Sequence, residues 1–350
     1  MHAEQLERRA ERVGHGIAVS KRQRGADKTM EWTVDNPEEG STTRMTFLRW
    51  EDIVSRAWVT GSLRFALKMT VVYWNYLWRL RWLDGWRLGK GPMIAMAYPP
   101  AFALVLPVLF GLPVTLVAWL LAPWWVAWPL GIAAGVVPAR RQIARMRAFW
   151  LVQLFIYNDH IARNGMPADM SERIESFAQA IAAALDDDDD EVLLVAHSNG
   201  AILVIPILLR VLARRGRPLP DNFAVVTYGH CVPLLTGRRD AAWFHAMLHE
   251  LAGHRFTWVD IGSPPDGAAF CQIDPLLPVA THGAIQLVLL SARFFRFCDS
   301  ANYRLDYASK YEAHFDYLRC GDRVSPIDFP SLSSSGKRLA EAIADFRKIP

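Results

Sequence analysis

The sequence contains few cysteines, and nothing in their spacing pairs them. The four cysteines lie far apart, at Cys231, Cys271, Cys298 and Cys320, and none forms a Cys-x-x-Cys pair. This excludes a disulfide-stabilised scaffold and indicates reduced thiols in a reducing compartment. The amino-terminal stretch, MHAEQLERRAERVG, also lacks the apolar core of a secretory signal.

The chain also lacks a Gly-rich phosphate loop, an internal repeat and a large excess of charge of one sign. Its formal net charge is +4, with 21% charged and 52% hydrophobic residues, which is slightly more apolar than an average globular protein. The 350 residues suffice for one large domain or two small ones. We expect a soluble domain joined to a membrane segment, with no cofactor.

One long segment is free of charge. No charged residue occurs from Gly91 to Ala139, a run more than twice as long as the ~20 residues that one membrane-spanning helix needs. We therefore expect residues 91–139 to form a transmembrane hairpin of two helices. Its turn has two candidates, Gly111-Leu112-Pro113 and Ala122-Pro123-Trp124, and the prolines of the segment leave a re-entrant hairpin as an alternative.

Basic residues flank this segment on both sides and predict its orientation. They are Arg79, Arg81, Arg87 and Lys90 before it and Arg140, Arg141, Arg145 and Arg147 after it. Basic flanks stay on the cytoplasmic side, so both ends of the hairpin should face the cytoplasm from the inner membrane.

Residues 61–90 form an interfacial segment in this interpretation. Trp74–Trp86 mixes Trp, Tyr and Arg, a combination that also stacks on nucleic-acid bases. Beside an apolar span it fits the headgroup region of a lipid bilayer better, so we expect a bilayer and no nucleic acid as partner.

Strand and helix patterns alternate through residues 140–330. The expected strands are Val192–Ala196, Phe223–Tyr228 and Phe256–Ile261, and the expected helices are Met170–Leu185, Ala201–Ala213, Ala241–Leu251 and Ala284–Phe297. This alternation predicts an α/β fold with a largely parallel sheet. Residues 1–60, with a helix at 3–12, would be the amino-terminal part of this domain, and residues 331–350 a carboxyl-terminal helix.

The sequence Val195-Ala196-His197-Ser198-Asn199-Gly200-Ala201 links an expected strand to an expected helix. It matches the nucleophile elbow G-x-S-x-G, with Ala196 in place of the first glycine. A turn this tight strains the serine backbone and needs small residues on both sides. The backbone N–H of Asn199, at the start of the helix, is positioned to donate to an oxyanion.

At these residues the sequence resembles the α/β-hydrolase superfamily, of esterase or lipase type, over roughly residues 149–318. The resemblance implies a sheet of α/β-hydrolase type interrupted by the membrane hairpin, and the chain order Ser, acid, His. The acid is expected in the loop after Phe256–Ile261, which selects Asp266, with Asp260 and Asp274 as alternatives. The base is expected late in the domain, which selects His314 over His282.

The resemblance implies a serine hydrolase of esterase or lipase type, of a membrane-anchored bacterial kind. The expected membrane location, rather than the resemblance, suggests a small lipophilic ester or thioester as substrate. Ser198 would attack the carbonyl, His314 would move the proton and Asp266 would hold the imidazole. The family's second oxyanion donor follows an upstream strand, but the only upstream His-Gly pair, His15-Gly16, follows a polar helical sequence. A non-catalytic membrane scaffold on a degenerate hydrolase domain is therefore the alternative.

A metal site is not expected. His245, His249 and His254 occur close together, but His249-Glu250-Leu251-Ala252-Gly253-His254 is one residue longer than the zinc motif H-E-x-x-H. The second histidine would then leave the helical face of the first.

Overall fold

A four-stranded parallel sheet forms the centre of the protein. The computed structural model describes residues 2–80, 90–145, 148–277, 281, 283–299 and 310–350. The sheet has the order β5 (Val192–His197), β6 (Phe223–Tyr228), β7 (Thr257–Gly262) and β8 (Gln286–Ser291), and every neighbouring pair is parallel. The prediction of an α/β fold with a largely parallel sheet is confirmed.

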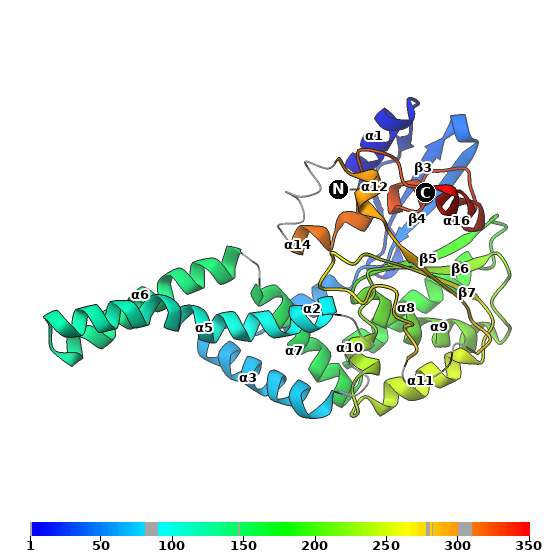
Figure 1. Ribbon diagram of the computed structural model, residues 1–350. Coiled ribbons are helices and arrows are strands. Elements are labelled where there is room, and N and C mark those ends of the chain that lie inside the picture. The colour runs from blue at the N-terminus through cyan, green and yellow to red at the C-terminus, as the bar shows by residue number, and fades with distance from the viewer. Residues whose placement is uncertain (1, 81–89, 146–147, 278–280, 282, 300–309) are drawn as a thin grey trace.

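Helices cover both faces of this sheet (Figure 1). One face carries α8 (Ala168–Ala184), α9 (Gly200–Arg215), α10 (Pro233–Thr236) and α11 (Ala242–Ala252). The other face carries α12 (Phe294–Phe297), α15 (Phe329–Leu332) and α16 (Leu339–Lys348). Both faces of the sheet are therefore shielded from water, which explains why β6 is buried along its whole length.

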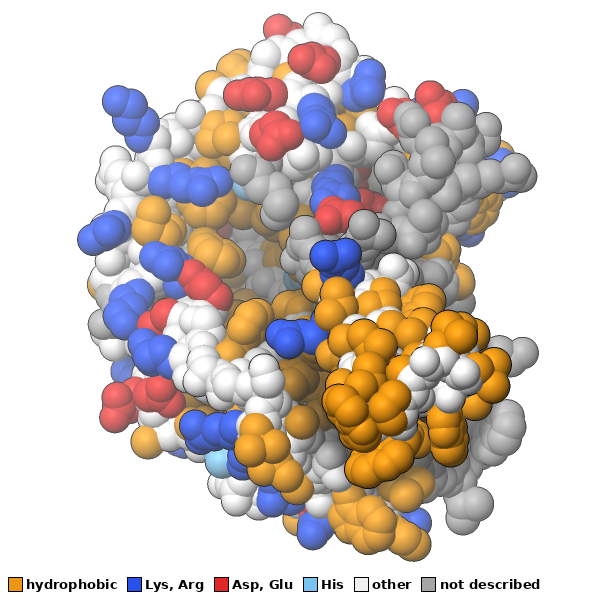
Figure 2. Space-filling view, turned by 90° about the vertical axis from the view of Figure 1, so that its left-hand side faces the viewer, with side chains coloured by type: hydrophobic (Ala, Val, Ile, Leu, Met, Phe, Trp, Pro, Cys, Tyr) orange, Lys and Arg blue, Asp and Glu red, His pale blue; other side chains and the backbone are white. Residues whose placement is uncertain are grey.

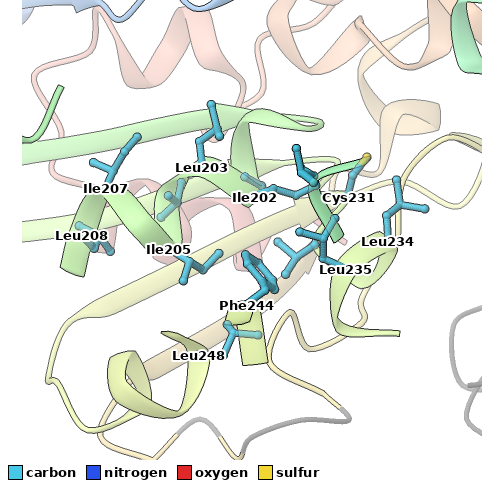
Figure 3. Close-up of a cluster of buried hydrophobic side chains, with 14 of the residues drawn as sticks. Ile202, Leu203, Ile205, Ile207, Leu208, Cys231, Leu234, Leu235, Phe244 and Leu248 are labelled. Carbon is cyan, nitrogen blue, oxygen red and sulfur yellow. The ribbon is translucent and has the colours of Figure 1, made fainter. Parts of the chain in front are cut away.

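Part of the larger core lies between α9, α10 and α11. Ile202 and Ile205 of α9 lie beside Leu235 of α10 and Phe244 and Leu248 of α11, and all five side chains are buried (Figure 3). Apolar residues recur around α9 at nearly every position because the helix is enclosed by the sheet and by its neighbouring helices.

The predicted helix over Ala284–Phe297 is wrong. Its central part forms β8, which continues the parallel sheet beside β7, and only Phe294–Phe297 is helical. The run Gln286-Leu287-Val288-Leu289-Leu290 is short and apolar, and periodicity alone does not separate a buried strand from a buried helix in such a run. Pairing with β7 satisfies its backbone hydrogen bonds and decides the outcome.

The amino-terminal region forms a second, antiparallel sheet. It follows α1 (His2–Val13) and contains β1 (Ala18–Val19), β2 (Gln23–Arg24), β3 (Met30–Asn36) and β4 (Ser41–Phe47), with short helices η1 (Ala26–Lys28) and η2 (Pro37–Glu39). Within the described ranges, none of these strands pairs with the central sheet.

This second sheet packs instead on the carboxyl-terminal segment. Asn36 donates to the Ser334 carbonyl at 2.8 Å, and the buried Arg9 pairs with Glu39 at 3.0 Å. The helix predicted for residues 331–350 occupies only Leu339–Lys348, because Ser333, Ser334 and Ser335 end α15 with hydrogen bonds to the preceding turn.

Two long helices project away from the body, α5 (Lys90–Leu121) and α6 (Trp124–Arg145) (Figure 1). They lie side by side because small residues face each other, and a Cβ atom on Gly111 would lie 2.5 Å from the Gly131 carbonyl oxygen. The chain turns at Ala122-Pro123, one of the two candidates, whereas α5 continues through Gly111–Pro113. Gly91–Leu121 is long and apolar enough to cross a membrane.

Helix α3 (Ser62–Arg79) precedes this pair, with α2 (Glu51–Ala57) before it. The rest of the predicted interfacial segment, residues 81–89, lies outside the described residues. One face of α3 packs on α7 (Ala148–Asn164), where Phe65 meets Phe149 edge-on and Tyr76 meets Phe155. The apolar run Phe149–Tyr157 belongs to α7 and is helical.

A buried ionic cluster joins α3, α7 and the segment after α10. Arg238 is fully buried and donates to Asp159 of α7 at 2.9 Å and to Asp240 at 2.8 Å. Asn75 of α3 donates to the same Asp159 at 3.1 Å, and the Arg238 guanidinium lies over the Tyr76 ring. Removing one member would leave a buried charge without its partner.

We predict that Arg238→Met lowers the free energy of unfolding by about 3 kcal/mol, because Asp159 and Asp240 then lose a buried partner. Arg163→Met is the matched control, since Arg163 also pairs with Asp159, at 2.8 Å, but is partly exposed. It should cost about 1 kcal/mol or less. Chemical unfolding in detergent measures both values, and equal losses would contradict the assigned role of Arg238.

Candidate active site

Ser198 occupies a strained turn between β5 and α9. Its φ is +58°, a left-handed value that side chains other than glycine rarely adopt. The Ser198 N–H continues the sheet by donating to the Tyr228 carbonyl at 3.0 Å. A Cβ atom on Gly200 would lie 3.7 Å from the Cβ of Ala196, so strand and helix approach closely across the serine. This is the geometry expected of a nucleophile elbow.

The structure brings together the three residues selected from the sequence. His314 Nε2 lies 2.7 Å from Ser198 Oγ, and His314 Nδ1 lies 2.8 Å from Asp266 Oδ2. Asp266 lies in the loop after β7, and His314 follows α14 (Lys310–Ala313). Both side chains are buried. A serine, an imidazole and a carboxylate in this order form the hydrogen-bonded chain that activates a hydroxyl nucleophile.

The alternative residues lie elsewhere. Asp260 is buried within β7, accepts a hydrogen bond from Thr227 Oγ1 at 2.7 Å, and has its pKa raised by burial. Asp274 accepts from the Leu276 N–H at 2.9 Å, as a turn residue does. His282 lies outside the described residues. Asp266 is therefore the acid that contacts His314.

Two further groups hold the Asp266 carboxylate. The Ala268 N–H donates to Oδ1 at 3.0 Å, and the Tyr317 hydroxyl donates to Oδ2 at 3.0 Å. Tyr317 is buried in η4 (Asp316–Leu318), and burial raises its pKa well above the usual value, so it stays a donor. Sequence patterns predict no role for Tyr317, because nothing near it in the chain shows that it reaches the distant loop that carries Asp266.

His197, the residue before the serine, supports the base. Its Nε2 lies 2.6 Å from the His314 carbonyl oxygen, and the two rings lie 4.7 Å apart. Burial, reinforced by the nearby His314, lowers the pKa of His197 to about 3. His197 is therefore neutral at pH 7, and its Nε2–H donates to that carbonyl.

The amide side chain of Asn199 turns away from the serine. Asn199 and Asn158 of α7 exchange two hydrogen bonds of 3.3 Å, and both residues are buried. This leaves the backbone of Asn199 as its only contribution to an oxyanion site. His15 lies 3.5 Å from Glu39 in the amino-terminal region, and β5 is an edge strand of the central sheet over the described residues. Over those residues, no upstream strand therefore pairs with β5 in the way that the resemblance implies for the second donor.

A small cavity of about 20 Å³ borders Ser198 and His314, which is room for about one water molecule. Its apolar walls come from the start of α5 and from α7, which contribute Pro92, Ala95, Met96, Trp150, Leu151, Leu154 and Phe155. A Cβ atom on Gly91 would lie 3.4 Å from Gly267 Cα, so α5 begins against the loop that carries the acid. The sequence did not predict that the long apolar helix would form part of this site.

Cys231 forms the opposite wall of the cavity. Its Sγ lies 3.6 Å from Ser198 Oγ, and burial raises its pKa to about 12. The sulfur is therefore a neutral thiol that contacts the serine without competing with it as a thiolate nucleophile.

The histidines discounted as metal ligands do not form a cluster. His245 Nε2 lies 3.4 Å from the Leu235 carbonyl oxygen. Across the residues that the structure describes, no group of three or more His, Cys, Asp or Glu side chains could hold a metal ion.

The chain matches no protein-family model, no curated protein and no solved structure. The geometry of the site therefore carries the functional argument by itself.

We predict that His197 contributes to a loss of stability in acid. Between pH 6.5 and about 3 the unfolded chain binds a proton at this residue and the folded chain does not. This lowers the free energy of unfolding by about 1.4 kcal/mol per pH unit as the pH falls. His197→Gln should reduce the slope by that amount, whereas the exposed control His249→Gln should not. An unchanged slope in His197→Gln would show that His197 is not held neutral.

We also predict that Tyr317→Phe slows labelling of Ser198 by a phosphonate probe about tenfold, because the Asp266 carboxylate loses a charge-assisted hydrogen bond. The acid limb of the pH profile should move to higher pH, since a less solvated carboxylate stabilises the imidazolium more strongly. Tyr228→Phe is the matched control, as Tyr228 is equally buried but donates to the Ile327 carbonyl. A purely structural role for Tyr317 would lower the labelling rate at every pH without shifting its pH profile.

Proposed function

We propose that the protein is a serine hydrolase of the α/β-hydrolase type that cleaves a lipophilic carboxylic ester or thioester. The observation that carries the proposal is the unbroken chain of hydrogen bonds from Ser198 through His314 to Asp266. The strained serine backbone adds to it, because such strain persists in a folded protein only where the surrounding structure holds it in place.

The reaction follows from these contacts. Ser198 Oγ attacks the substrate carbonyl carbon while His314 Nε2 accepts the hydroxyl proton, and the Asn199 N–H donates to the developing oxyanion. Collapse of the tetrahedral intermediate expels the alcohol or thiol, which takes the proton from His314. Water then attacks the acyl-enzyme with His314 as base, releasing the acid and restoring Ser198.

The topology supports the same superfamily. The serine follows β5, the acid follows β7, the second strand after it, and the histidine comes last, which is the superfamily order. Among the described residues the chain departs from the superfamily at the edge of β5, where no upstream strand pairs. Losing one oxyanion donor typically costs about 10²–10³ in rate.

The helices α5 and α6 are proposed to anchor the protein in the inner membrane as a transmembrane hairpin. Apolar side chains along both helices are exposed, and Figure 2 shows hydrophobic side chains gathered on this part of the surface with Lys and Arg side chains at its margin. Basic margins favour the cytoplasmic side, so the catalytic domain would face the cytoplasm. Because α5 also borders Ser198, this arrangement would place the serine beside a helix of the bilayer, which suits a substrate dissolved in the lipid.

A non-catalytic scaffold is the second candidate. The small cavity beside Ser198 and the lack, among the described residues, of an upstream strand beside β5 favour it. The two proposals differ in whether Ser198 is chemically activated.

We predict that a fluorophosphonate probe labels the detergent-solubilised protein and that Ser198→Ala abolishes labelling. His314→Ala should slow it by about 10⁴ or more, and Asp266→Asn by a similar factor, because these groups act as a unit. Ser55→Ala, an exposed serine on α2, is the control and should label like the wild type.

Labelling rates and thermal unfolding should be measured on the same samples. A folded wild-type protein that does not label would reject the hydrolase and favour the scaffold. Labelling that survives in Ser198→Ala would show that another residue is the activated nucleophile.

A further inference from the structure

Helix α3 exposes an apolar face that nothing in the described structure covers. Its large side chains recur at intervals of three and four residues, which places them on one side of the helix. They are Leu63, Leu67, Val71, Trp74 and Trp78, and each is about half exposed or more, up to 76% for Leu63. Such a continuous stripe is unusual on a soluble surface and marks an interaction site.

The opposite face of α3 is apolar as well. Phe65, Val72 and Tyr76 pack toward α7 and the core. A helix that is hydrophobic on both faces is enclosed by protein or by lipid on both sides. Protein covers one side of α3, so its outward side needs a second apolar environment, which is either another protein surface or membrane lipid.

We propose that the outward face of α3 is a third membrane-contact element, which lies against an anionic lipid bilayer beside α5 and α6. Figure 1 shows the beginning of α3 next to the projecting helices, so its exposed stripe continues their exposed apolar surface. This inference rests on the proposed membrane anchorage but not on the proposed catalysis.

The polar side chains of α3 fit a lipid headgroup layer. Arg64 and Lys68 are exposed and lie one helical turn apart at the edge of the stripe, and the helix carries no acidic residue. Trp74 and Trp78 lie within the stripe, and their rings are 5.6 Å apart. Tryptophan and basic residues together are typical of the boundary between headgroups and acyl chains.

Contact at α3 would set the catalytic domain against the membrane. Phe149, at the start of α7, meets Phe65 of α3, and the next residue, Trp150, lines the cavity at Ser198. The cavity walls from α5 and α7 then lie between lipid-contacting helices. The acyl group of a bilayer-resident ester would reach Ser198 from the lipid phase without crossing water.

The test places an environment-sensitive NBD fluorophore on cysteines introduced one at a time into the full chain. Val71→Cys reports on the α3 stripe, Leu120→Cys on the end of α5, and Phe47→Cys on an exposed apolar residue of β4, in the antiparallel sheet. The proteins are reconstituted into phosphatidylcholine vesicles with and without phosphatidylglycerol. Wild-type protein carried through the same labelling gives the background from its native cysteines.

We expect doxyl-labelled lipid to quench NBD at Val71→Cys and Leu120→Cys at least threefold more strongly than at Phe47→Cys, with iodide showing the reverse order. Arg64→Gln together with Lys68→Gln should reduce lipid quenching at Val71→Cys in anionic vesicles by about fivefold or more, and leave Leu120→Cys unchanged.

The other outcomes overturn the inference. Lipid quenching at Leu120→Cys with iodide access at Val71→Cys would reject the α3 contact and keep the hairpin anchor. Protection of Val71→Cys from iodide without lipid quenching would mean that protein, such as a second copy of the chain, covers α3. Iodide access at both positions would reject the membrane anchorage itself, while probe labelling of Ser198 would still test catalysis separately.

Discussion

Parallel pairing of β5, β6 and β7 brings the carboxyl ends of these strands to one edge of the sheet. Ser198 follows the first strand and Asp266 follows the third, so the register of the sheet sets the separation of nucleophile and acid before any side chain is placed. His314 then needs only to bridge this fixed gap, with contacts of 2.7 Å and 2.8 Å on its two ring nitrogens. The proposed chemistry depends on this alignment.

Burial makes the hydrogen-bond partners of Asp266 and His314 important. A buried carboxylate is costly unless hydrogen bonds satisfy it, and Asp266 receives them from His314, Tyr317 and the Ala268 N–H. His197 remains neutral and holds the backbone of His314 in place. A group of conformationally fixed donors around one charge is the usual way in which an enzyme holds a polar site in its working geometry.

Local patterns predicted the parts of this site that depend on local constraints. The short apolar strand, the small residues Ala196 and Gly200 and the following helix identified Ser198, and chain order then selected Asp266 and His314. The role of Tyr317 and the packing of Trp150 and Met96 beside Ser198 depend on contacts between distant segments, which no local pattern encodes. The strand β8 was mistaken for a helix for a related reason, since its type is decided by its neighbour β7.

The start of α5 connects the proposed anchor to the proposed chemistry, because the same helix is exposed along its apolar length and borders the serine at its amino end. The central claim is that Ser198 is an activated nucleophile. Its most direct test is peptide mass spectrometry of the reconstituted protein after reaction with a phosphonate. An activated Ser198 should form a single adduct in the folded chain and none after unfolding. An adduct on another residue, or none in folded protein, would contradict it.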